Sequence, residues 1–260
     1  MSTLSTTTLH TMAGVLASAD ADREPIAPLS AAYPDLTVAE AYEIQALHAR
    51  ARAVEIVGHK IGLTSTAMQE MLGVDEPDYG CLYADRVLES GTSIAEADLI
   101  APRVEPEIAF VLAKPLAGPG VTAEDVLAAT AYVVPSVEVI DSRIADWRIT
   151  LVDTIADNAS CARVVLGDTR TAPGDVDLAA AAVELRVNDE TVAQGVGSAV
   201  LGHPAEAVAW LANALGAHGV TLEAGHVLMP GSLTAAFPFA AGDHVVADFG
   251  PLGSVEVRCS

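Results

Sequence analysis

The stretch Arg-Val-Glu-Pro-Glu-Ile-Ala-Phe (RVEPEIAF), residues 103–110, constrains the fold most strongly. It opens a segment from Val104 to Ala113 that has the pattern of a β-strand. Side chains two apart in a strand point to the same face, so Glu105 and Glu107 are expected to project together. Carboxylates on an apolar face repel each other and are costly to desolvate, and a bound cation would relieve that cost. Pro106 lacks a backbone donor, which favours a strand edge or a bulge.

A second strand pattern, from Val133 to Ile140, is also interrupted by an acid, Glu138. Three carboxylates are hard oxygen ligands, which suit Mg²⁺ or Mn²⁺ better than zinc and leave room for water or a chelating substrate. Spacing alone leaves an alternative, in which these acids lie on an exposed strand face or pair with Arg103 and Arg143.

A lysine in a glycine-bounded apolar segment is the next candidate. Gly-His-Lys-Ile-Gly-Leu-Thr-Ser (GHKIGLTS), residues 58–65, contains Lys60, and Lys114 is the only other lysine in the chain. Partial burial would lower the pKa of Lys60 and allow it to shuttle protons. The alternative is an ordinary surface lysine.

Glycines recur between residues 58 and 91, and this pattern suggests loops near a site. Within this region, Glu-Pro-Asp-Tyr-Gly (76–80) is a turn sequence, in which Asp78 would ordinarily be a turn former.

The rest of the chain predicts an α+β protein with a helical N-terminal part, residues 1–57, and a β-rich catalytic core, residues 58–260, forming one continuous functional unit. Thr37 and Glu40 form a capping box that starts a helix. The other expected elements are a helix from Thr122 to about Ala131, a hairpin at 183–193, a helix at 205–215, and strands at 226–229, 244–249 and 254–258.

Charge and composition exclude several classes of protein. The chain has 260 residues and a formal net charge of −22, so it has no basic stripe for nucleic acid and no attraction to an anionic membrane. An acidic surface still permits an anionic substrate, because exposed charges are screened beyond about 8–10 Å. The odd number of cysteines, the absence of a signal-peptide pattern and the absence of a long apolar segment favour a reduced, cytoplasmic location.

Several stretches together resemble the 2-keto-4-pentenoate hydratase (2-hydroxypenta-2,4-dienoate hydratase) family of the fumarylacetoacetate hydrolase-like superfamily. They extend in matching order from about residue 35 to the end of the chain. The stretches are GHKIGLTS (58–65), MLGVDEPDYG (71–80), PRVEPEIAF (102–110), PSVEVIDSRI (135–144), DTIADNASC (153–161), LGHP (201–204) and GSL (231–233).

This resemblance implies a β-rich fumarylacetoacetate hydrolase-like roll with surrounding helices. It also implies that Glu105, Glu107 and Glu138 hold Mg²⁺ or Mn²⁺. The acid/base pair would fall on Lys60 and Asp78.

The implied substrate is a 2-hydroxy-2,4-dienoate, the dienol form of a 2-keto-4-enoate. Ser160 is expected near its carboxylate, and Leu63 is expected to line its binding site. A hydro-lyase of this kind adds water to give a 4-hydroxy-2-oxo acid in the catabolism of aromatic or related ring compounds. The family also implies a homo-oligomer and allows a pathway enzyme as partner.

Alternatives remain at this stage. A metal-dependent decarboxylase of 4-oxalocrotonate-type 2-oxo diacids would use the same chelate, although residues 146–161 and the GSL at 231–233 look more like a hydratase. A longer hepta-2,4-diene-dioate is another substrate. A C–C hydrolase would need a His/Glu dyad that the sequence does not reveal. A non-catalytic partner of a pathway enzyme would not need the intact set of acids and lysine.

Overall fold

Three helices form the N-terminal end of the protein in the computed structural model, which describes residues 4–65, 69–70 and 73–260. They are α1 (Thr6–Asp22), α2 (Leu29–Ala32) and α3 (Val38–Arg52). The predicted capping box starts α3, because Thr37 Oγ1 accepts from the Glu40 amide at 3.3 Å and Glu40 Oε2 accepts from the Thr37 amide at 2.9 Å. Each bond satisfies a backbone donor that the helix itself leaves unpaired.

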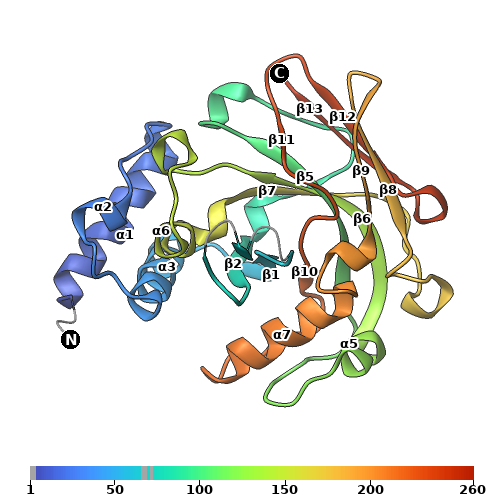
Figure 1. Ribbon diagram of the computed structural model, residues 1–260, viewed down its shortest axis with the longest axis horizontal. Helices are drawn as coiled ribbons and strands as arrows, with labels where there is room; N and C mark the ends of the chain where they lie inside the picture. The colour runs from blue at the N-terminus through green and yellow to red at the C-terminus, as the bar shows by residue number, and fades with distance from the viewer. Residues whose placement is uncertain (1–3, 66–68, 71–72) are drawn as a thin grey trace.

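These helices have a core of their own. Leu16 of α1 and Ile44 of α3 are fully buried and belong to one cluster with Ile155 of α6 (Leu151–Ala156). Figure 1 shows α1, α2, α3 and α6 gathered at one end of the molecule, opposite β8 and β9. α6 therefore connects the N-terminal helices to the sheet.

Most strands of the described chain form one mixed sheet, in the order β2-β1-β10-β5-β6-β7-β3, with β11 pairing with β5. Their bounds are β1 (Ile56–Gly62), β2 (Asp78–Tyr83), β3 (Val87–Glu89), β5 (Arg103–Leu112), β6 (Thr130–Ile140), β7 (Cys161–Leu166), β10 (Val227–Met229) and β11 (Phe237–Pro238). Both predicted acidic strands are confirmed as β5 and β6, which run antiparallel along their length.

The register of β5 and β6 places Glu105 directly opposite Glu138. On its other side β5 pairs with β11 near Val104 and with β10 near Phe110, so the segment around Pro106 is a local edge. Leu233 N–H donates to the Pro106 carbonyl at 3.0 Å across this gap. The missing donor of Pro106 therefore costs no ladder hydrogen bond, as the sequence predicted.

A smaller sheet has the order β4-β13-β12-β8-β9 and packs against one face of the large sheet, where one hydrophobic cluster contains residues of both. Its strands are β4 (Thr92–Ile94), β8 (Ala182–Val187), β9 (Glu190–Val196), β12 (His244–Asp248) and β13 (Ser254–Cys259). The predicted hairpin is β8–β9. Asn188 and Asp189 form its turn with φ of 52° and 67°, the conformation that a tight hairpin requires.

Two further helices, α5 (Ala123–Ala129) and α7 (Pro204–Gly216), pack against the same cluster. The helix expected to reach about Ala131 ends two residues earlier, because Thr130 already belongs to β6. Helix α7 confirms the apolar periodicity of 205–215. No described helix combines the length and the apolar character needed to cross a membrane.

The expectation of loops in the glycine-rich region is wrong for two segments. Gly58 and Gly62 lie in β1, and Asp78 starts β2 instead of forming a turn. A Cβ atom on Gly58 would lie 1.8 Å from the Val227 carbonyl oxygen of β10. This glycine permits a close approach of two backbones inside a sheet.

Gly58→Ala is therefore expected to destabilise the protein by about 1–3 kcal/mol or more, because the clash is with backbone and no flexible side chain can yield. The matched change Gly14→Ala lies on the exposed face of α1, where no atom other than the local helix backbone lies within 4 Å of the added Cβ. It should stabilise the protein by about 0.5–1 kcal/mol. Urea unfolding of both variants measures the two effects. Equal stabilities would contradict the close approach of β1 and β10.

Candidate functional site

Three glutamates from β5 and β6 form one cluster. Glu105, Glu107 and Glu138 each offer a carboxylate oxygen, and these oxygens lie within 4.8 Å of one another. Glu107 and Glu138 are fully buried, and Glu105 is partly exposed. The structure thus brings together the three acids that the sequence singled out, on the face of the large sheet turned away from the small sheet.

The carboxyl groups are poorly satisfied without a cation. Glu107 Oε2 accepts from the Gly231 amide at 2.8 Å. Glu107 Oε1 and both oxygens of Glu138 have no hydrogen-bond partner among the described residues. Burial, followed by repulsion from Glu138, raises the pKa of Glu105 to about 7 and that of Glu107 well above its usual value. Converging buried oxygens that repel each other fit a hard divalent cation.

Lys60 of β1 lies beside the cluster. Its Nζ is 3.4 Å from Glu138 Oε2 and donates to the Ala159 carbonyl at 3.1 Å. Burial by itself lowers the pKa of Lys60, but the carboxylates of Glu138, Asp78 and Glu105 together raise it above its usual value. The predicted burial is confirmed, while the predicted fall in pKa is wrong for the protein alone, because the surrounding acids outweigh desolvation.

Asp78 faces the same site from the start of β2. Its side chain is 2% exposed, and a Cβ on Gly62 would lie 2.2 Å from Asp78 Oδ1 and 3.5 Å from Lys60 Nζ. Gly62 is therefore the position that lets Asp78 approach Lys60. Burial raises the pKa of Asp78, and Lys60 partly offsets this. Met71 and Leu72, which begin the matching 71–80 stretch, lie outside the described residues.

The two residues expected at the substrate also lie near this site. Ser160 is 3% exposed, and its Oγ has no hydrogen-bond partner in the described part of the chain. Leu63 follows β1 directly and has a left-handed φ of 57°. A non-glycine residue in this conformation is often found at functional sites, because the surrounding fold must hold it there.

Some contributors were not predicted from the sequence. Gly231, with φ of 119°, directs its amide to Glu107, and a Cβ there would lie 2.1 Å from Thr64 Oγ1. Asn158 and Arg143 hold the segment that carries Ser160. The GSL motif at 231–233 signalled the first of these only as a resemblance, without a role.

The affinity for the metal ion should decrease as the pH is lowered, because protons and the cation compete for the same carboxyl groups. With the pKa of Glu105 near 7, this acid is mostly ionised at pH 8 and mostly protonated at pH 6. Mg²⁺ binding is therefore expected to weaken by about tenfold or more between these values. Calorimetric titration at both values measures this, and equal affinities would contradict the assigned cluster.

Comparison with known proteins agrees with this geometry. Residues 59–260 match the family model described as "Fumarylacetoacetate (FAA) hydrolase C-terminal". The chain therefore belongs to the fumarylacetoacetate hydrolase-like superfamily and, within it, to the 2-keto-4-pentenoate hydratase family.

Two curated relatives and one solved structure illustrate the similarity. The chain is 51% identical over 223 residues to a 2-hydroxyhexa-2,4-dienoate hydratase of Comamonas testosteroni, covering 84% of each protein. It is 41% identical to 2-keto-4-pentenoate hydratase 1 of Dechloromonas aromatica (strain RCB), covering 98% of each. The solved 4-oxalocrotonate decarboxylase from Pseudomonas putida G7, complexed with magnesium and adipate, is 38% identical with a TM-score of 0.97 and complete coverage of both chains.

Proposed function

We propose that this protein is a hydro-lyase that adds water to a 2-hydroxy-2,4-dienoate, giving a 4-hydroxy-2-oxo acid in the breakdown of aromatic or related ring compounds, and that it depends on a divalent cation. The observation that carries the proposal is the cluster of Glu105, Glu107 and Glu138 with Lys60 beside it. Relatives named as hydratases of such dienoates support the choice of reaction.

The three glutamates would hold Mg²⁺ or Mn²⁺. When bound, the cation would supply Lewis-acid polarisation of the substrate oxygen at C2. A magnesium complex of a 38% identical decarboxylase supports a divalent cation in this fold. Comparing turnover with Mg²⁺, with Mn²⁺ and with neither will identify the ion that this chain uses.

Charge shows why further donors are needed. Three carboxylates and one divalent cation sum to −1, so an anionic substrate needs other groups to bind it. The Lys60 ammonium and the Ser160 hydroxyl, which has no hydrogen-bond partner among the described residues, could supply these donors, and Leu63 would contact the carbon chain. Ser160 would donate to the substrate carboxylate, and Leu63 would exclude water from its side.

Lys60 and Asp78 would handle the protons. The reaction takes the proton from the C2 hydroxyl and places one at C5, and water then adds with its hydroxyl at C4 and a proton at C3. Two buried groups of opposite type lie close together here, and their pKa values are both raised. A carboxyl group with a raised pKa beside an ammonium is an arrangement that can both donate and accept protons.

The test is a spectrophotometric assay with freshly generated 2-hydroxypenta-2,4-dienoate and with its 6-carbon homologue. Loss of the dienol absorbance is followed with Mg²⁺, with Mn²⁺ and with a chelator. Fast, metal-dependent loss that yields the 4-hydroxy-2-oxo acid supports the proposal. No loss with either substrate and either metal would reject it.

A second candidate is metal-dependent decarboxylation of 4-oxalocrotonate. The observation that favours it is the full-length similarity to a solved decarboxylase, with a TM-score of 0.97. Higher identity to a named hydratase, 51% against 41% for a named decarboxylase, favours hydration. Release of CO₂ from 4-oxalocrotonate, with no hydration of the dienoates, would decide for the decarboxylase.

Family membership supports a proposal for the assembly, and the odd number of cysteines supports one for the location. We infer a cytoplasmic homo-oligomer that acts on a small 2-oxo or 2-hydroxydienoic acid and is open to association with an enzyme of the same pathway. Size-exclusion chromatography with light scattering measures the assembly. A monomer at micromolar concentration would reject it.

A further inference from the structure

The turn formed by residues 158–160 is strained, and it places a backbone carbonyl and a hydroxyl group at the site. Asn158, Ala159 and Ser160 are consecutive, buried, and all left-handed, with φ of 56°, 49° and 56°. L-residues other than glycine adopt this conformation at a cost in free energy, and usually singly. Three in a row persist only where the surroundings hold them, and such strain gathers at functional sites.

The two groups that the turn presents are the Ala159 carbonyl and the Ser160 hydroxyl. The Ala159 carbonyl accepts from Lys60 Nζ at 3.1 Å, and the Ser160 hydroxyl is buried without a partner among the described residues. The amide of Asp141, just beyond β6, donates to the Ser160 carbonyl at 2.8 Å. The turn thus joins Lys60 of β1 to the end of the strand that carries Glu138.

The side chain of Asn158 fixes this turn to β2. Its Oδ1 accepts from the Cys81 amide at 2.7 Å, and its Nδ2 donates to the Cys81 carbonyl at 3.0 Å. β2 is the last strand of the large sheet, so its outer edge has no strand partner in the part of the chain that the structure describes. The side-chain amide takes the place of a neighbouring strand, three residues beyond Asp78.

The packing between turn and strand leaves no spare room. A Cβ on Gly80 would lie 2.4 Å from the Asn158 carbonyl oxygen. Gln45 of α3 adds a second clamp, since its Nε2 donates to the carbonyls of Tyr79 and Ile155, each at 2.9 Å. These contacts therefore fix the position of the strand that carries Asp78 relative to the segment that carries Ser160.

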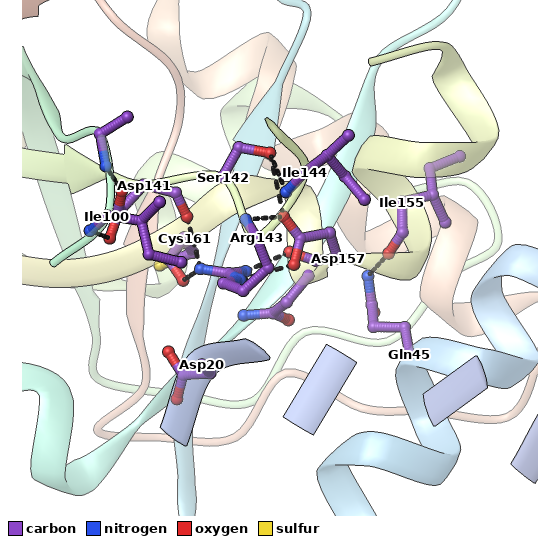
Figure 2. Close-up of polar contacts among 12 residues, drawn as sticks. Asp20, Gln45, Ile100, Asp141, Ser142, Arg143, Ile144, Ile155, Asp157 and Cys161 are labelled. Atoms are coloured by element: carbon purple, nitrogen blue, oxygen red, sulfur yellow. Dashed lines mark hydrogen bonds and ion pairs between the residues drawn. The ribbon is translucent and has the colours of Figure 1, made fainter. Parts of the chain in front are cut away.

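A buried ion pair anchors the start of the turn. Arg143 Nε donates to Asp157 Oδ1 at 2.5 Å, its amide donates to Oδ2 at 3.0 Å, and its Nη2 donates to the Asp157 carbonyl. Its Nη1 donates to the carbonyls of Asp141 and Cys161. Figure 2 shows the guanidinium among these groups, so one side chain binds residues on both sides of the turn.

We propose that Asn158 is a positioning residue, whose side-chain amide, together with the Arg143–Asp157 ion pair, holds the left-handed turn so that the Ala159 carbonyl orients the Lys60 ammonium. This rests on the proposed function for the effect on turnover. The orientation of Lys60 itself can be measured without a substrate.

Asn158→Gly is the informative variant, because glycine tolerates the positive φ and only the two bonds to Cys81 are removed. Asn188→Gly is the matched control. It changes another asparagine, with φ of 52°, whose side chain also makes two hydrogen bonds, in the hairpin of the small sheet. The activity of both variants is compared with that of the unaltered protein in the presence of Mg²⁺.

For Asn158→Gly we expect kcat to fall about 10–100-fold with Mg²⁺ affinity unchanged, because Lys60 is misplaced while the glutamates stay in position. Asn188→Gly should keep the kcat of the unaltered protein. A loss confined to KM, or an equal loss in both variants, would overturn the proposal. If Asn158→Gly does not fold, Asn158→Asp replaces it, since its carboxyl group keeps the acceptor for the Cys81 amide and puts an oxygen in place of the donor to the Cys81 carbonyl.

A readout independent of turnover uses the two lysines of the chain. In ¹⁵N-lysine-labelled protein, Lys60 and Lys114 give the two side-chain ammonium signals, and Lys114→Arg assigns them. Hydrogen exchange at Lys60 should accelerate about tenfold or more in the Asn158 variant and stay unchanged in Asn188→Gly. An unchanged Lys60 signal would overturn the positioning role even if the protein is an active hydratase. A changed signal in a protein without hydratase activity would instead reject the proposed function alone.

Discussion

Glu107→Gln is expected to abolish measurable binding of Mg²⁺ or Mn²⁺ and to lower kcat/KM by about 10³-fold or more. Glutamine matches glutamate in size, so the packing on β5 and the hydrogen bond from Gly231 can remain. What disappears is a fully buried negative charge within 4.8 Å of two others. A factor of 10³ corresponds to about 4 kcal/mol, within the several kcal/mol that a catalytic cation supplies.

Calorimetric titration with each metal and the dienoate assay measure the two effects. Glu190→Gln, an exposed glutamate at the start of β9, is the control and should change neither quantity. Metal binding and turnover that both survive in Glu107→Gln would show that the cluster is assigned wrongly.

The same variant should have the opposite effect on stability without metal. Burial raises the pKa of Glu107 well above its usual value, so the charged form is costly in the folded protein. A neutral amide avoids that cost, and the metal-free variant is expected to unfold at a temperature equal to or higher than that of the metal-free parent. Loss of function with gain of stability distinguishes a site acid from a structural one.

Local pattern explains why the acids of β5 were predictable. The alternation from Val104 to Leu112 places Glu105 and Glu107 on one face, and this depends only on neighbours along the chain. The pairing of Glu105 with Glu138 depends on strand register, which periodicity alone does not determine. The strand patterns could therefore offer Glu138 only as a further candidate beside Glu105 and Glu107, and it was the resemblance to a family that assigned all three to one ion.

The glycines of β1 and β2 were misjudged for a related reason. Glycine signals a loop by its conformational freedom, but Gly58 and Gly62 are needed because another backbone or side chain lies against them. Those contacts come from Val227, which is distant in the sequence, and from Asp78, which lies opposite Gly62 on the paired strand. The residues that neighbour a glycine in the sequence do not reveal such contacts. The same holds for Asn158 and Cys81, which are 77 residues apart.

The pKa of Lys60 shows how the environment reverses a local rule. A glycine-bounded lysine in an apolar segment suggests desolvation and a lowered pKa. The fold instead surrounds it with Glu138, Asp78 and Glu105, and their charges raise its pKa. A cation held by the glutamates would offset part of that negative charge, so metal and ammonium are expected to compete electrostatically for the same acids.

Lys60→Met is therefore expected to lower kcat by about 10²–10⁴-fold, the range typical for loss of a proton-transfer group. Methionine has a similar length, fills the buried space and leaves Glu138 free to bind metal. Because the ammonium nitrogen lies 3.4 Å from Glu138 Oε2, its removal should leave Mg²⁺ affinity unchanged or tighten it.

Lys114→Met, at the only other lysine, which is exposed, should alter neither quantity. Turnover is measured at saturating Mg²⁺, which also compensates the buried acids that lose their partner. Weakened metal binding would make Lys60 a support of the metal site, and unaltered turnover would remove it from the reaction.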